Sequence, residues 1–183
     1  MLDLPSHLNI PVLNMPVLSG QLRAALRWPG WREALREGAV AGTVAGVLST
    51  VVLALAGRWQ AGSAAAPVNA ASHWLWGDES LREDAPTWRH TLPGFLTQHA
   101  ASVFWAALYS RVYGHRPEAK ELPNAILGGI ATSAAAYVVD YTVTPKRLTP
   151  GYEHRLDGKG MLAVYAALAL GFAAGAVALR RGR

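Results

Sequence analysis

The sequence predicts an all-α membrane protein, a bundle of four transmembrane helices preceded by an interfacial N-terminal segment. Of its 183 residues, 51% are apolar and 16% are charged, and the charges gather between long apolar windows. A helix needs about 20 apolar residues to cross the hydrocarbon core of a bilayer. Four windows reach that length, which leaves too little polar surface for a soluble globule.

The four windows differ in the ionisable groups that they hold. We expect the spans at residues 38–57, 91–110, 122–144 and 160–179. The first and the last contain no charged residue, and each is followed directly by an arginine. The second contains one titratable side chain, His99, and the third contains one charge, Asp140, near its end.

Tryptophans gather between the windows rather than within them. Of the seven, only Trp105 lies inside a predicted span. The others are Trp28, Trp31, Trp59, Trp74, Trp76 and Trp88. Indole prefers the headgroup region of a bilayer, where the ring meets apolar material and the N–H stays hydrated. The distribution therefore supports the membrane interpretation.

Residues 1–37 form a separate region, which we expect to be a basic interfacial arm. Prolines interrupt its apolar stretch and no basic residue precedes that stretch, so it is not typical of a secretory signal peptide. Residues 19–36 combine Leu and Trp with several arginines, which suits a helix lying on anionic headgroups. A solvated arm is the alternative. Residues 38–183 make up the bundle.

The basic residues orient the predicted bundle. With four spans both termini lie on one side, and the segments on that side carry most of the Lys and Arg residues. The positive-inside rule then places both termini in the cytoplasm and the 58–90 loop in the periplasm of a bacterial inner membrane. The basic loop at 145–159 opposes this orientation. The net charge of +5 fits an anionic leaflet, so we expect the lipid bilayer as partner and no nucleic acid.

Glycines recur at a spacing of four residues in the first and last windows. They are Gly38, Gly42 and Gly46 in the first, and Gly171 and Gly175 in the last. Glycines at this spacing form a flat ridge, which lets a second helix approach closely. The ridge fits either a seam with another copy or another membrane protein, or packing within one chain.

His99 and Asp140 are ionisable side chains inside predicted spans, where an ionisable group is energetically costly. At 1.5 Å per residue, His99 lies roughly 12 Å and Asp140 roughly 6 Å below the same outer boundary. Tyr137 shares a face with Asp140, and Tyr165 enters the same half from the last window. We expect a polar intramembrane cluster of these four residues. It either handles a proton, a cation or a small ligand, or forms a structural hydrogen-bond network.

The sequence contains few signals of a metal site, a haem site or a catalytic site. The chain has no Cys, which excludes disulfides, zinc–thiolate sites, iron–sulfur clusters and thiol catalysis. Only His99 lies deep in a span, whereas a bis-His haem needs two ligands at matching depth. Neither an HExxH zinc motif nor a placed GxSxG elbow occurs. We therefore expect no cofactor, no metal and no catalytic residue.

Three stretches resemble uncharacterised bacterial inner-membrane proteins of four spans. They are PVNAASHWLWGDE at 67–79, HTL at 90–92 with HAASVFWA at 99–106, and the Thr- and Pro-rich stretch at 141–154. The layout of residues 38–180 is similar to that of the YagU-like family. This resemblance implies a bacterial inner-membrane location and no assigned reaction, and it transfers no catalytic residue.

These observations favour a non-enzymatic inner-membrane protein that acts through helix packing or assembly. The alternative is a small transporter-like or proton-responsive membrane protein that uses His99 and Asp140. An intramembrane enzyme is the weakest reading, because the sequence offers no nucleophile with a matching base.

Overall fold

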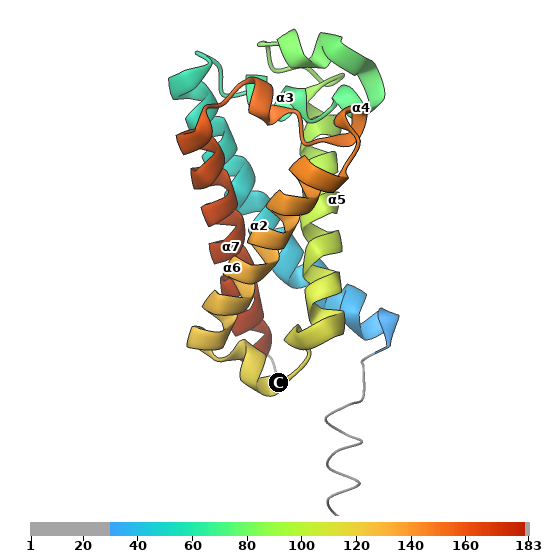
Figure 1. The fold of residues 1–183 in the computed structure, drawn as a ribbon, viewed down its shortest axis with the longest axis vertical. Helices are drawn as coiled ribbons and strands as arrows, with labels where there is room; N and C mark the ends of the chain where they lie inside the picture. The colour runs from blue at the N-terminus through green and yellow to red at the C-terminus, as the bar shows by residue number, and fades with distance from the viewer. Residues whose placement is uncertain (1–29, 182–183) are drawn as a thin grey trace, which may run out of the picture.

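The computed structural model describes residues 30–181, in which the regular structure is helical throughout and contains no strand (Figure 1). The long helices are α2 (Trp31–Gln60), α5 (Thr91–Tyr109), α6 (Leu122–Val138) and α7 (Gly158–Arg181). A π-helical turn continues two of them, η2 (Ser110–Gly114) after α5 and η4 (Val139–Val143) after α6. The all-α prediction is confirmed for this part of the chain.

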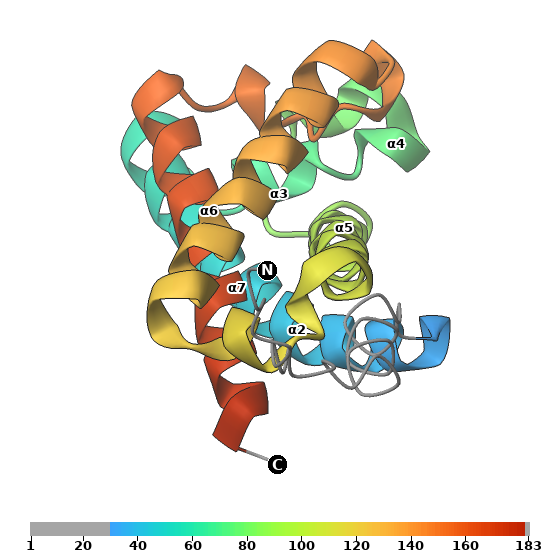
Figure 2. The same cartoon turned by 60° about the horizontal axis from the view of Figure 1, so that its bottom comes forward.

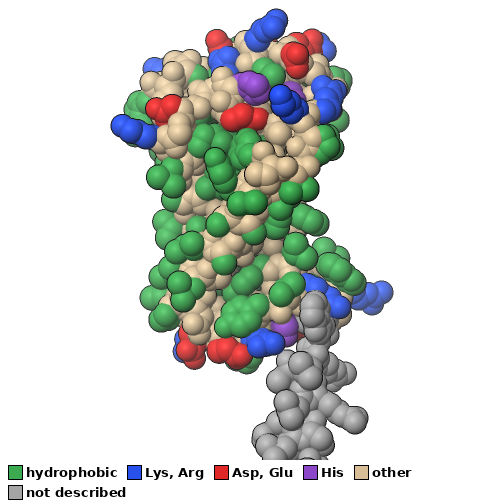
Figure 3. Space-filling model, viewed as in Figure 1, with side chains coloured by type: hydrophobic (Ala, Val, Ile, Leu, Met, Phe, Trp, Pro, Cys, Tyr) green, Lys and Arg blue, Asp and Glu red, His purple; other side chains and the backbone are tan. Residues whose placement is uncertain are grey.

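Three of the helices are long and apolar enough to cross a membrane. They are Trp31–Gln60, Leu122–Val143 and Gly158–Arg180. Apolar side chains cover the waist of the molecule, and charged ones gather at its two ends (Figure 3). These features indicate a membrane protein. α5 fills the predicted second window but is not among the three, because polar side chains such as Gln98, His99 and Ser102 interrupt it. Three of the four predicted spans therefore correspond to helices with the length and composition of a membrane span, and α5 does not.

The first helix begins earlier than expected. α2 starts at Trp31, directly after Gly30, so residues 31–37 of the predicted interfacial arm form its first turns. The rest of that arm, residues 1–29, lies outside the described residues. The guanidinium carbon of Arg111, in η2, lies 5.5 Å from the centre of the Trp31 ring. With 30 residues, α2 is longer than the bilayer core requires.

The helices are arranged in the order α5, α2, α7, α6. α2 packs along both α5 and α7, and α6 packs along α7 (Figures 1 and 2). α5 and α6 have much less contact with each other. The bundle therefore has a gap in its packing on the side where α5 and α6 would have closed it.

Both predicted glycine runs face other helices of the same chain. A Cβ at Gly38 would lie 2.6 Å from the Cα of Ala107, and one at Gly42 would lie 2.7 Å from the nitrogen of Val103, both in α5. Gly46 faces His99, also in α5. Gly171 and Gly175 face Ala45 and Ala41 of α2 in the same way. A side chain at Gly38, Gly42, Gly171 or Gly175 would overlap its neighbours, and one at Gly46 would be tight at 3.1 Å from His99, so the glycines allow the close packing of α2.

Short helices form a cap over one end of the bundle. The segment between α2 and α5 contains α3 (Ala66–Ala70), α4 (His73–Trp76) and η1 (Gly77–Arg82). The loop between α6 and α7 adds η5 (Lys146–Leu148) and η6 (Tyr152–His154). Gly151 joins the two parts: its φ of 89° lies in the left-handed region, and an added Cβ would lie 2.6 Å from the carbonyl oxygen of Ala70. η3 (Pro117–Lys120) lies at the opposite end.

Candidate functional site

Asp140 lies on the π-helical turn η4, where α6 reaches the cap. Its Oδ2 accepts a hydrogen bond of 2.8 Å from the hydroxyl of Tyr165 on α7. Tyr165 is buried, and the ring of Tyr137 contacts it edge-on with 5.1 Å between the ring centres. A π turn changes the direction of the side chains that follow it, and such turns are frequent at functional sites. Three of the four predicted cluster residues are therefore together.

A second tyrosine extends this hydrogen-bonded chain into the cap. The hydroxyl of Tyr152, on η6, donates to the hydroxyl of Tyr165 at 3.4 Å. Burial raises the pKa of Tyr152 above its ordinary value, which keeps its hydroxyl protonated as a donor. The order of donation is Tyr152 to Tyr165 to Asp140.

Glu153 is a second acid near this chain, and the sequence analysis did not select it. Its Oε2 accepts a hydrogen bond of 3.3 Å from Tyr141, and its Oε1 accepts one of 2.7 Å from Thr149. The Tyr141 ring lies 5.0 Å from that of Tyr137, centre to centre. Its position beside Tyr152 in the TPGYEH stretch was the available signal, but that stretch contributed only to the family resemblance and to the basic loop at 145–159.

His99 lies apart from the other three predicted residues. Its Nε2 is 3.4 Å from the Oγ1 of Thr43 on α2, and its ring stacks on Phe95 at 5.6 Å. Its Nδ1 is buried without a hydrogen-bond partner in the described part of the chain. No hydrogen bond or ion pair joins His99 to Asp140 among the described residues. The two residues have similar predicted depth, but α5 presents His99 to α2.

Asp140 lines a groove of about 750 Å³ that lies between α5 and η4, the turn that continues α6. The walls of the groove come mainly from α5, and α4, η4 and the loop around η5 supply most of the rest. The apolar lining residues are Ala71, Trp74, Leu75, Leu92, Pro93, Leu96, Ala100, Ala101, Phe104, Trp105, Val139, Leu148 and Pro150. The polar ones are Thr97, Gln98, Asp140 and Thr144. Among the residues that the structure describes, Asp140 is thus the only ionisable side chain that lines this groove.

The partners of Asp140 differ from those of Glu37, a buried acid. Among residues 30–181, no Lys, Arg or His forms an ion pair with Asp140. Glu37 contacts the Lys120 ammonium directly and also accepts a hydrogen bond of 2.6 Å from Ser110. Both members of the Glu37–Lys120 pair are buried. No local signal in the sequence marks this pair, because its two members lie 83 residues apart.

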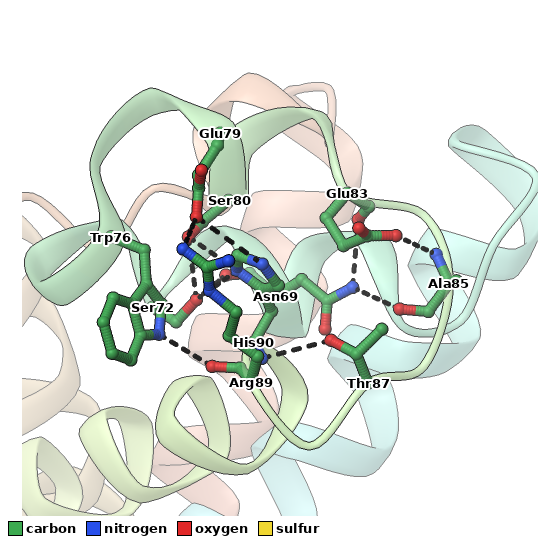
Figure 4. A network of polar contacts seen from close by, with 10 residues as sticks. All are labelled: Asn69, Ser72, Trp76, Glu79, Ser80, Glu83, Ala85, Thr87, Arg89 and His90. Carbon is green, nitrogen blue, oxygen red and sulfur yellow. Dashed lines mark hydrogen bonds and ion pairs between the residues drawn. The ribbon is translucent and has the colours of Figure 1, made fainter.

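The cap contains a further polar network, drawn in Figure 4. The Nδ1 of His90 lies 3.0 Å from the Oγ of Ser80, and its Nε2 lies 3.9 Å from Glu79. This order of serine, histidine and acid is that of an activated nucleophile, which needs access to a substrate. Ser80 is 0% exposed and also accepts a hydrogen bond from Ser72. The network therefore holds the cap together rather than presenting a reactive group.

Asn69 has the same structural role in the cap. Its Nδ2 donates to the carbonyl oxygens of Glu83 and Ala85 at 3.0 and 2.9 Å (Figure 4). Its Oδ1 accepts a hydrogen bond of 2.7 Å from Thr91. These bonds tie α3 to the start of α5.

No group of three His, Cys, Asp or Glu side chains in the described chain is placed to hold a metal ion. No known protein family, curated protein or solved structure matches the chain.

Proposed function

We propose that the chain is a small transporter-like or proton-responsive membrane protein in which Asp140 binds and releases a proton. One observation carries the proposal: Asp140 lines a largely apolar groove, and no basic side chain among the described residues is paired with it. A carboxylate at membrane depth without a counter-charge is costly. A proton or an external cation removes that cost, so the site has a reason to exchange one for the other.

The neighbours of Asp140 suit two protonation states. Tyr165 donates to the carboxylate, and Tyr152 donates to Tyr165. A hydroxyl can also accept, so a protonated Asp140 can donate to Tyr165 after the phenol turns. Glu153 and Tyr141 are the other titratable groups near this chain, and α5 contributes none to the groove.

We further propose that α5 is the fourth spanning helix. Its 19 residues extend about 29 Å, close to the thickness of the bilayer core. Its two most polar side chains contact α2: Gln98 donates to Ser49 at 3.2 Å, and His99 contacts Thr43. Exposed apolar residues, Leu92, Leu96 and Phe104, occupy other faces. This arrangement supports a span whose polar groups avoid lipid.

With four spans both termini lie on the same side, and the basic residues favour the cytoplasm of a bacterial inner membrane, as in the YagU-like layout. A reporter that is active only in the cytoplasm, fused after Arg183, is expected to work. The same reporter inserted after Glu79, in the cap, is expected to be inactive. Activity at both positions would contradict the fourth span.

The glycine runs support this function over assembly by helix association. All five predicted glycines face helices of their own chain, so their surfaces are occupied without a partner copy.

Proton binding by Asp140 is tested by infrared difference spectroscopy of the full chain in lipid vesicles. As the pH falls from about 8 to about 5, we expect the carbonyl stretch of a protonated carboxylic acid to appear. Asp140→Asn is expected to lack this band. Glu118→Gln, which removes an exposed acid at the opposite end, is the matched control and is expected to keep it. An unchanged band in Asp140→Asn would contradict the proposal.

A further inference from the structure

The groove between α5 and α6 has a shape and charge that define one class of ligand. Its volume of about 750 Å³ is within the range of small-molecule sites. Its walls are mostly apolar, and the only ionisable lining residue in the described part of the chain is an acid. We propose that it binds a hydrophobic cation, an amine or onium ion with an apolar body, whose positive centre lies against Asp140. This inference rests on the proposed function, because the same carboxylate would exchange its proton for the cation.

Charge complementarity is the first argument for this occupant. Among residues 30–181, no Lys, Arg or His lines the groove, so no described basic side chain there competes for the Asp140 carboxylate. The Tyr165 hydroxyl contacts one carboxylate oxygen, Oδ2. A cation in the groove would supply the missing counter-charge, whereas an anion would meet a like charge in an apolar surrounding.

The aromatic walls are the second argument. Trp74, Phe104 and Trp105 all line the groove. Trp74 is held in place because its Nε1 donates to the carbonyl oxygen of Thr149 at 2.8 Å. Phe104 and Trp105 contact each other edge-on, with 5.5 Å between ring centres. Aromatic faces attract cations and bury apolar surface, so these walls favour an organic cation over a hydrated metal ion.

The position of the groove is the third argument. Leu92, Leu96 and Phe104, which line it on α5, are exposed on the part of the molecule that apolar side chains cover. A hydrophobic cation partitions into a bilayer and would reach the groove from the side. A lipid acyl chain or an apolar helix of a second copy would also fit the walls, but neither would neutralise Asp140.

Tetraphenylphosphonium and tetraphenylborate form a matched pair of probes, since they share one shape and carry opposite charges. Binding to the full chain is measured by equilibrium dialysis in discs of neutral phosphatidylcholine, which does not itself attract cations by charge. We expect the phosphonium to bind saturably, with weaker affinity at low pH, and the borate to show no saturable binding. Asp140→Asn is expected to weaken phosphonium binding about tenfold or more, and Glu118→Gln to leave it unchanged.

A second variant tests the groove without touching the carboxylate. Ala101 lines the groove, so Ala101→Trp is expected to fill part of it and weaken phosphonium binding. The same variant is expected to keep the infrared band of protonated Asp140. It keeps the inference testable if Asp140→Asn fails to fold.

The outcomes separate the two proposals. Equal binding of both probes, a bound lipid that the phosphonium does not displace, or full phosphonium binding by Ala101→Trp would overturn the cation site. An infrared band from Asp140 without phosphonium binding would overturn the cation site and leave the proton-responsive function standing. Phosphonium binding that depends on Asp140, with no infrared band, would support the cation site and overturn proton binding.

Discussion

Gln60, the last residue of α2, and Asp157, directly before α7, are joined by two hydrogen bonds. The Nε2 of Gln60 donates to the Oδ1 of Asp157 at 2.9 Å, and the backbone N–H of Asp157 donates to the Oε1 of Gln60 at 2.8 Å. The same Oδ1 accepts the N–H of Gly160 at 2.8 Å, which makes Asp157 the N-cap of α7. One carboxylate therefore caps a helix and fixes it to the end of another.

This carboxylate predicts a dependence of stability on pH. The pKa of Asp157 lies below its ordinary value of 3.8, chiefly because the carboxylate accepts the Gly160 N–H. A lowered pKa in the folded state means that the stabilisation is complete above the ordinary value and is lost as the pH falls below it. Asp157→Asn, measured by thermal unfolding in detergent, is expected to melt a few degrees below the unmodified protein at neutral pH.

That difference is expected to narrow as the pH falls below the ordinary value of 3.8, because a growing share of Asp157 is then neutral, as asparagine is. Asp78→Asn, which removes an exposed acid of the cap, is the control and is expected to melt with the unmodified protein at neutral pH. A difference that stays constant down to the lowest pH would show that the Asp157 charge adds nothing beyond the hydrogen bonds.

Close packing of α2 on α5 predicts a large effect from one methyl group. A Cβ at Gly42 would lie 2.7 Å from the nitrogen of Val103, and backbone cannot turn aside as a side chain can. Gly42→Ala is expected to lower the free energy of unfolding by on the order of 1–3 kcal/mol. Gly158→Ala is the matched control, because an added Cβ there meets nothing within 4 Å. If Gly42→Ala melts no lower than Gly158→Ala, the two helices pack less closely than described.

The positions of the helices were predictable because their ends carry local signals. Windows 91–110 and 122–144 agree with α5 and with α6 plus η4 to within one residue at each end. α2 and α7 extend past windows 38–57 and 160–179. Charged residues bound these windows in the sequence, but the ends of a helix accept charged residues.

The side on which a residue lies was harder to predict than its depth. Counting residues gives the height of His99 and Asp140, but their separation depends on which helices pack together. α5 packs on α2 and not along α6, so His99 meets Thr43. The structure of the cap could not be predicted from neighbouring residues in the sequence. Its buried Asn69 donates hydrogen bonds to carbonyl groups 14 and 16 residues away.

We expect the side chains of Glu37 and Lys120, at the other end of the bundle, to be strongly coupled in their effect on stability. They are 83 residues apart in sequence, and their ion pair ties α2 to the segment before α6. Lys120→Met would leave the buried carboxylate without that ammonium, and we expect a loss of about 3–5 kcal/mol in unfolding free energy. Glu37→Gln with Lys120→Met is expected to lose less than the sum of the single changes. Additive losses would mean that the pair contributes little beyond its packing.

Two double-mutant cycles that share Asp140→Asn test the candidate site itself. In the first, Tyr165→Phe removes the hydroxyl that donates to Asp140 at 2.8 Å, so the two changes should be coupled by about 0.5–3 kcal/mol. In the second, His99→Ala changes a residue that contacts α2 and shares no hydrogen bond with Asp140, so the effects should add to within about 0.5 kcal/mol. Unfolding free energies in one detergent supply all the values. Coupling in the His99 cycle with none in the Tyr165 cycle would mean that Asp140 points toward α5 in the working protein, and the hydrogen-bonded chain through Tyr165 would then be the wrong description of the site.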